Sequence, residues 1–260
     1  MNTFYRRGLA LLALTTIGAA LAPFAAAQAV VINGCAIKPY ASCMGASLGS
    51  TYLFGANLAH ADLSQADLAG ANLTRAHLAG ANLEGARLAG ARLAQADLML
   101  ANLTHTSLDR AQLSKTILTK AWLTGASLRN TRLKGANLDG AHLAGADCTG
   151  AFLAGASLER ARLSRVRLVG ADLTGAFLRR AMMSRANLTD AVLVQTDLTQ
   201  ASLAHANLSR ADLSGADLSG ADLSGANLSD ADLTNADLTD ANLAGANLHH
   251  AIMPDGLIHR

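Results

Sequence analysis

A five-residue register runs through most of this 260-residue chain and constrains its fold more than any other feature. From residue 41 to residue 255 the chain divides into 43 units, and the central residue is Leu in all but four of them. The residue two positions before each centre is Ala or, in a few units, Thr or Val. A helix of period 3.6 cannot keep a five-residue repeat on one face, whereas residues two apart on an extended segment point to the same side. The register therefore predicts a solenoid of short extended segments with Ala and Leu facing inward.

The composition supports a repeated cross-section. Hydrophobic residues make up 51% of the chain but aromatic residues only 3%, whereas an irregular core normally also uses aromatic and β-branched side chains to fill its shape. The last residue of the unit is Gly in 18 units, which suits a turn with positive φ. Asp or Asn often precedes the central Leu, as at Asn57 and Asp62, and such side chains bond to backbone groups at turns. Each unit is therefore expected to form one side and one corner of a coil.

The units resemble the pentapeptide-repeat family, whose motif is A(D/N)LXX. Nearly pure copies run from Ala211-Asp-Leu-Ser-Gly to Ala226-Asn-Leu-Ser-Asp. The resemblance covers residues 41–255 and implies an all-β fold, a right-handed quadrilateral parallel β-helix in which four units make one coil. The units would then form about ten to eleven coils. We expect residues 28–40 to be an N-terminal cap segment and residues 256–260 to be a C-terminal tail.

Residues 1–27 have the pattern of a secretory signal peptide. Two arginines precede an uncharged run of 15 residues at 8–22, and three small residues follow at 25–27. This run is short for a membrane-spanning helix, so we expect an exported protein, periplasmic or secreted, that does not span the membrane. An amphipathic or buried N-terminal helix is the alternative interpretation. A lipoprotein box ending at Cys35 fits poorly, because Cys35 lies well past the apolar run.

The cysteines and the two ends of the solenoid lead to further expectations. In an oxidising compartment we expect Cys35 and Cys43 to form a disulfide across the first coil; the alternative is two unpaired thiols. Cys148 takes the place of an inward Leu, which predicts a buried and inert thiol. At the other end Pro254 cannot donate a further ladder hydrogen bond. A thinly covered end leaves homodimerisation through the C-terminal coils as a hypothesis.

Nothing in the sequence predicts catalysis, a cofactor or a metal site. Catalysis needs a nucleophile or an acid near a base in an enclosed site, and an uninterrupted solenoid has no loops in which to build one. The adjacent His249 and His250 have no cysteine nearby with which to form a metal site. The glycines recur at corners and do not form a phosphate-binding loop. We therefore expect a protein that is not an enzyme.

The charges are distributed unevenly along the chain. The formal net charge of +2 argues against nucleic acid as a partner, because nucleic-acid-binding domains usually carry a large basic excess. Residues 75–185 hold 16 Lys and Arg against 7 Asp and Glu, whereas residues 186–255 hold one Arg against 10 acids. Stacking in steps of twenty gathers several basic residues around the lone Trp, and such residues are enriched at the centres of interfaces. This candidate partner patch consists of Lys120, Trp122, His142, Arg160, Arg162, Arg180 and Met182. The alternative interpretation is solubilising charge with one stray aromatic residue.

These observations favour a non-enzymatic, exported structural or interaction module, a rigid rod that presents polar columns to an unknown envelope or extracellular protein. The resemblance implies an alternative, because some pentapeptide-repeat proteins mimic B-form DNA and bind type II topoisomerases such as gyrase. The acidic columns that would serve a mimic are Asp212, Asp217, Asp222, Asp232 and Asp237. The signal peptide and the basic middle of the chain argue against mimicry. A third hypothesis is binding of an anionic envelope polymer by the basic belt, which would weaken steeply with added salt.

Overall fold

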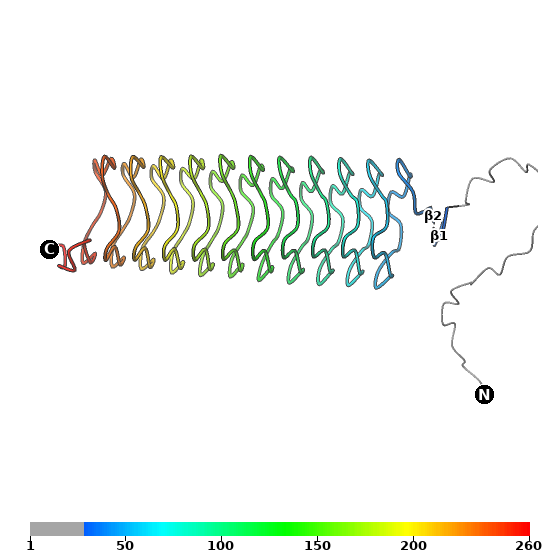
Figure 1. Ribbon diagram of the computed structural model, residues 1–260, viewed down its shortest axis with the longest axis horizontal. Coiled ribbons are helices and arrows are strands. Elements are labelled where there is room, and N and C mark those ends of the chain that lie inside the picture. The colour runs from blue at the N-terminus through cyan, green and yellow to red at the C-terminus, as the bar shows by residue number, and fades with distance from the viewer. Residues whose placement is uncertain (1–28) are drawn as a thin grey trace, which may run out of the picture.

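The computed structural model describes residues 29–260, so the predicted signal peptide at 1–27 lies outside the described residues. A short antiparallel hairpin precedes a long rod of stacked coils (Figure 1). Its strands are β1 (Val31–Ile32) and β2 (Cys35–Ala36). The hairpin lies at one end of the rod and the C-terminus lies at the other (Figure 1).

Every coil of the rod consists of four five-residue units. Parallel β-bridges join residues twenty positions apart, from Ser42 with Asp62 to Asp232 with Ile252. Each unit contributes one bridge residue, the one before the central Leu, and a two-residue turn follows that Leu. Each side is therefore a very short extended segment, as we expected, because the chain turns a corner every five residues. The result is the quadrilateral parallel β-helix implied by the resemblance.

The backbone donors of one unit, 61–65, show how the coils are held together. Three of its five N–H groups donate to carbonyl oxygens of the neighbouring coils at 2.7–2.8 Å, and the N–H of Ala61 closes the turn onto Leu58 at 3.0 Å. The remaining N–H, that of Ser64, donates to Oδ1 of Asp62 at 3.1 Å. The Asp or Asn before the central Leu thus satisfies the one donor that the ladder leaves unpaired. This accounts for the frequency of Asp and Asn at that position.

The inward side chains form one continuous core along the rod. The central leucines from Leu58 to Leu233 are almost completely buried, and so are the alanines beside them. Five threonines stand at inward positions. The hydroxyl of Thr51 donates to the carbonyl of Leu48, and the hydroxyls of the other four donate to carbonyls of the preceding coil: Thr106, Thr116, Thr131 and Thr196. Cys148 is buried, as we expected. Burial raises the pKa of its thiol to about 12, so the reactive thiolate is absent at neutral pH.

The last residue of every unit from 41–45 to 246–250 has a positive φ whether or not it is Gly. We expected glycine to mark such corners, yet Lys120 (φ 56°) and Arg160 (φ 54°) adopt the same left-handed conformation. A non-glycine residue there costs about 1 kcal/mol. The ladder holds it in place, as where the N–H of Lys120 donates to the carbonyl of Asp139 at 2.9 Å. The corners can therefore carry columns of long side chains.

The two ends of the rod are covered differently. At the N-terminal end the predicted disulfide between Cys35 and Cys43 is present, with an S–S distance of 2.06 Å, and ties the hairpin to the first coil. At the other end we expected only a stop at Pro254, but the tail turns back and Ile258 pairs antiparallel with Ile252. The tail covers one side of the last coil. The inward leucines of the other three sides are only partly buried: Leu238, Leu243 and Leu248.

Candidate functional site

One side of the rod departs from the Asp and Asn pattern in five successive coils, the last of which carries Ser202. Trp122, His142, Arg162 and Met182 follow one another there, each joined to the next by a parallel bridge. The rings of Trp122 and His142 pack against each other with their centroids 4.1 Å apart. About half of the Trp122 and Met182 surfaces remain exposed. The structure therefore stacks in one column the four residues that the sequence grouped.

The remaining predicted residues, Lys120, Arg160 and Arg180, lie at the adjoining corner. Gly140 stands between Lys120 and Arg160 in this corner column, and a surface depression of about 380 Å³ opens where a side chain is absent. The lining residues are Leu100, Lys120, Trp122, Gly140, His142, Arg160 and Arg162. We call the seven predicted residues together the Trp122 surface. Arg180 and Met182 extend it by one coil beyond the depression.

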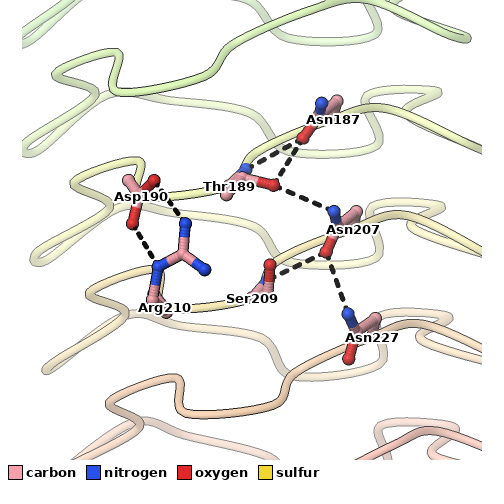
Figure 2. A network of polar contacts seen from close by, with 7 residues as sticks. All are labelled: Asn187, Thr189, Asp190, Asn207, Ser209, Arg210 and Asn227. Atoms are coloured by element: carbon pink, nitrogen blue, oxygen red, sulfur yellow. Dashed lines mark hydrogen bonds and ion pairs between the residues drawn. The ribbon is translucent and has the colours of Figure 1, made fainter.

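The cations of the Trp122 surface have no acidic partner within residues 29–260. No ion pair there involves its lysine or its three arginines. Asp139 and Glu159 line an adjoining depression with Lys120 and Arg160 but form no ion pair with them. Figure 2 shows the contrast in the acidic half, where Arg210 donates to both carboxylate oxygens of Asp190 at 2.7 and 2.8 Å. Cations without such partners are available to an anionic group of a ligand.

His142 is uncharged at neutral pH. Burial lowers the pKa of its imidazole below the ordinary value of 6.5, and the positive charge of Arg162 lowers that pKa further. A neutral ring keeps one donor and one acceptor nitrogen. The surface therefore presents a largely apolar platform, made of two rings inclined at 39° to each other, between fixed positive charges. This arrangement suits a partner that places an acidic group beside an aromatic or apolar one.

The same column leaves backbone donors open. The donors two positions after its members form no hydrogen bond within residues 29–260: the N–H groups of Thr124, Ala144, Ser164 and Ser184. Where Asn or Asp occupies the column position the donor is satisfied, as where Ser209 donates to Oδ1 of Asn207 at 3.1 Å (Figure 2). The coils of this column thus lack a stabilising contact that about half of the units possess. These open N–H groups remain available to water or to a partner.

Sequence reasoning missed a comparable surface on the opposite side of the rod. Arg92, Gln112, Arg132 and Phe152 also occupy four successive coils without Asp or Asn. A depression of about 300 Å³ lies beside them, lined by Ser114, Arg132, Lys134 and Phe152. The absence of Asp and Asn before Leu was the signal that could have found it. Arg165 and Arg185, at the second corner beside Trp122, were missed as well.

The acidic columns in the second half of the rod bond to their own backbone. In Asp222, hydrogen bonds from the hydroxyl and the N–H of Ser224 lower the pKa of the carboxyl below its ordinary value. Ser219 has the same effect on Asp217. These side chains are therefore ionised at neutral pH and form a fixed negative surface. No group of His, Cys, Asp and Glu within residues 29–260 is arranged to hold a metal ion.

No helix in the described part of the chain has the length and apolar character needed to cross a bilayer.

Comparison with known proteins agrees with the repeat pattern. The family model for pentapeptide repeats matches with 8 copies, in overlapping stretches from 51–88 to 216–253. No curated protein matches the chain. Among solved structures, the chain is similar to HetL, a pentapeptide repeat protein involved in heterocyst differentiation regulation from the cyanobacterium Nostoc sp.. HetL is 38% identical over 85% of this chain and 92% of its own, with a TM-score of 0.44.

Two further structures are more distant. QnrB1, a plasmid-mediated fluoroquinolone resistance protein, is 21% identical over 70% of this chain and 88% of its own, with a TM-score of 0.35. A pentapeptide repeat protein of the Arabidopsis thaliana thylakoid lumen is 28% identical over 41% of this chain and 71% of its own, with a TM-score of 0.23. The family model matches most of the rod. The chain therefore belongs to the pentapeptide-repeat family, whose fold is the right-handed quadrilateral β-helix.

Proposed function

We propose that this protein is an exported interaction module, a rigid rod that presents the Trp122 surface to a protein of the cell envelope or the extracellular space. Pentapeptide-repeat proteins are generally non-enzymatic protein-interaction modules. The observation that carries the proposal is the packed pair Trp122 and His142, which lies beside a depression and among cations without acidic partners. Trp and Arg are the residue types that most often dominate binding energy at interfaces.

The rod also supplies preorganisation. Each coil is bonded to the next by three backbone hydrogen bonds in every unit, as the unit 61–65 shows. The columns of outward side chains are therefore held at a fixed spacing of about 4.8 Å along the rod. Binding to such a surface orders few groups, so more of the contact energy appears as affinity.

The test compares two variants that replace the same kinds of side chain, one aromatic and three cationic, on opposite sides of the rod. The first combines Trp122→Ser with Arg160→Gln, Arg162→Gln and Arg180→Gln. The matched control also removes one aromatic and three cationic side chains: Phe152→Ser, Arg92→Gln, Arg132→Gln and Lys134→Gln. Both should keep thermal stability nearly unchanged, because surface substitutions usually do. Partners recovered with the wild type from envelope and extracellular fractions should be lost from the first variant and kept by the control. The proposal is refuted if the first variant still binds these partners, or if both variants lose them equally.

Export is supported by the pattern of residues 1–27 and by the disulfide of the first coil, a bond typical of oxidising compartments. The measurement is the intact mass of the protein from separate cytoplasmic and extracytoplasmic fractions. An extracytoplasmic chain that begins at Gln28 or Val30 and is two hydrogens light is the expected result. A full-length, reduced chain found in the cytoplasm would refute export.

A cytoplasmic location would favour the second candidate, a DNA mimic that binds a type II topoisomerase such as gyrase. Its support is the ionised acidic surface around Asp217 and Asp222. The test is inhibition or protection of purified gyrase in a supercoiling assay. Loss of that effect on replacing the acidic columns, with the Trp122 variant still active, would establish mimicry in place of the envelope role.

Two further features belong to the same proposal. The unpaired cations favour, as a third candidate partner, an anionic envelope polymer, whose binding should fall steeply as salt rises.

The partly buried Leu238, Leu243 and Leu248 at the uncovered C-terminal end favour homodimerisation through the last coils. Sedimentation of the wild type against a Leu243→Lys variant tests the dimer, which the charge should dissociate. A wild-type monomer at all concentrations would exclude it.

A further inference from the structure

Exposed apolar side chains gather at the N-terminal end of the rod. Three of the six aromatic residues within 29–260 belong to this end. Tyr40 is 76% exposed, Tyr52 73% and Phe54 45%. Met44 and the hairpin valines are also largely exposed. We call these residues the N-terminal collar: Val30, Val31, Tyr40, Met44, Tyr52 and Phe54.

The collar coincides with the least charged part of the rod. Between residues 29 and 61 Lys38 is the only Lys, Arg, Asp or Glu. The basic belt begins at residue 75, and residues 186–255 at the far end carry one Arg and 10 acids. Exposed apolar side chains that gather at one end of a molecule often mark a contact with another surface. The near absence of charged side chains among these residues indicates that the surface they contact is itself apolar.

The arrangement of the collar indicates the shape of that surface. Tyr40 and Met44 flank one side of the first coil, while Tyr52 and Phe54 lie two sides further along the chain, on the opposite side of the quadrilateral. The hairpin that carries the valines lies beyond them at the end of the rod (Figure 1). A partner that binds along one side of the rod would touch only half of the collar. An interface that the rod enters end-on touches all of it.

We propose that the N-terminal collar inserts into the interfacial region of a lipid bilayer and holds the rod end-on to the membrane. Tyrosine is enriched at this level of the bilayer because its ring is apolar and its hydroxyl is polar. Interfacial segments enter about 5–10 Å, which corresponds to one or two coils at a spacing of about 4.8 Å. The first carboxylate, Asp62, lies one coil beyond the collar, where the rod would emerge.

Two cations at the collar fit the same orientation. Lys38 is exposed and can extend its amine to lipid phosphates while its alkyl chain stays among apolar groups. Arg75, in the next coil, lies over the ring of Phe54 at 6.0 Å. The acidic coils at the far end would be repelled by an anionic membrane surface. The charge distribution therefore opposes the reverse orientation.

The position of the collar connects it with the proposed export, on which its biological setting rests. Residues 1–28, which include the apolar run at 8–22, join the rod at the collar. The collar is therefore the end of the rod next to the membrane when the chain is translocated. Lipid binding itself can be measured without reference to export, so failure of one proposal is distinguishable from failure of the other.

The experiment measures co-sedimentation of the chain, as recovered from cells, with neutral phosphatidylcholine vesicles. The collar variant carries Tyr40→Ser, Tyr52→Ser and Phe54→Ser. The control carries Trp122→Ser, Phe152→Ser and Phe177→Ser, three aromatic residues that are each 49% exposed elsewhere on the rod. Because both variants share the same N-terminus, any contribution of that segment cancels. The collar variant should bind vesicles at least about tenfold more weakly than the wild type, and the control should bind as the wild type does.

Salt and fluorescence give independent readouts. Insertion of the collar should persist at about 1 M salt, where charges are screened within about 3 Å. In a Trp122→Phe background, Tyr52→Trp should show a blue shift of emission on addition of vesicles, whereas native Trp122 should show none. The proposal is overturned if neutral vesicles are not bound, if salt abolishes binding, if the control loses as much as the collar variant, or if Tyr52→Trp shows no shift. Binding confined to anionic vesicles would instead identify the basic belt as the lipid-binding surface.

Discussion

Replacing Trp122, His142, Arg162 and Met182 together with Asn should stabilise the protein while abolishing binding at the Trp122 surface. Each new amide oxygen would accept the open N–H two residues further along, as Asn207 accepts the N–H of Ser209 at 3.1 Å. The new amides would also bond to one another along the rod. Natural Asn residues do so in the next column. There Nδ2 of Asn227 donates to Oδ1 of Asn207 at 3.1 Å (Figure 2), and Nδ2 of Asn247 donates to Oδ1 of Asn227 at 3.0 Å.

The expected gain in the free energy of unfolding is about 0.5–3.5 kcal/mol. Four hydrogen bonds at partly exposed sites contribute roughly 0.5–1 kcal/mol each. Against this, the contact between the rings of Trp122 and His142 is lost, which costs about 0.5–1.5 kcal/mol. The gain would show that the natural residues are retained for something other than stability, a trade common at functional surfaces.

Urea unfolding followed by far-ultraviolet circular dichroism is the suitable assay, because the variant lacks the only Trp of the chain. The control is Asn207→Ala, which removes the acceptor of a backbone N–H and interrupts a natural ladder. It should lose about 1 kcal/mol. An Asn variant no more stable than the wild type, beside a destabilised control, refutes the reasoning. A stabilised variant that still binds its partner would mean that binding takes place elsewhere.

The remaining predictions concern the core, the buried thiol and acid. Leu138→Asp is expected to unfold the middle coils, because Leu138 is fully buried and an unpaired carboxylate cannot be accommodated there; loss of the circular dichroism signal measures it. The Cys148 thiol, whose pKa burial raises to about 12, should resist alkylation in the native protein and react in urea, as intact mass would show. Hydrogen bonds from Ser224 lower the pKa of Asp222 below 3.8 in the folded state, so the stability from this carboxylate is present above that value and is lost as pH falls through the folded-state pKa. The thermal midpoint should accordingly drop below about pH 4.

Each of these predictions has a contrary outcome. Leu243→Asp changes a partly buried position in the last coils and should destabilise much less than Leu138→Asp; equal effects would contradict a closed core. Rapid alkylation of native Cys148 would contradict its burial. Asp222→Asn keeps the oxygen acceptor but does not titrate, so an unreduced acid transition in that variant would assign the pH dependence to other groups.

The repeat predicted the direction of almost every side chain in the rod. Because one unit equals one side and one corner, knowledge of a residue's place in the unit is enough to predict that Leu138 and Cys148 face inward and that Trp122 faces outward. The pairing of Cys35 with Cys43 could also be predicted, since only these cysteines bracket the start of the rod. Such features depend on local periodicity, which a sequence displays directly.

Other features depend on which atoms meet after a full coil. Glycine frequency predicted the corner conformation, but not that Lys120 and Arg160 share it. The opposite surface around Phe152 escaped notice, because its signal is a missing hydrogen-bond acceptor rather than a motif. Which cations are paired also depends on the side chain twenty residues away, as Arg210 and Asp190 show.

The sequence by itself therefore determined the solenoid, its inward residues and its uneven charge, because each follows from the five-residue period or from composition. Only the tertiary structure decided which cations remain unpaired beside Trp122, how the tail from Pro254 turns back on the last coil, and that the collar surrounds one end of the rod. The physical reason is that hydrogen bonds and ion pairs between coils form between residues about one coil apart. Which of these bonds form depends on how successive coils stack in three dimensions, and a single unit of the sequence does not contain that information.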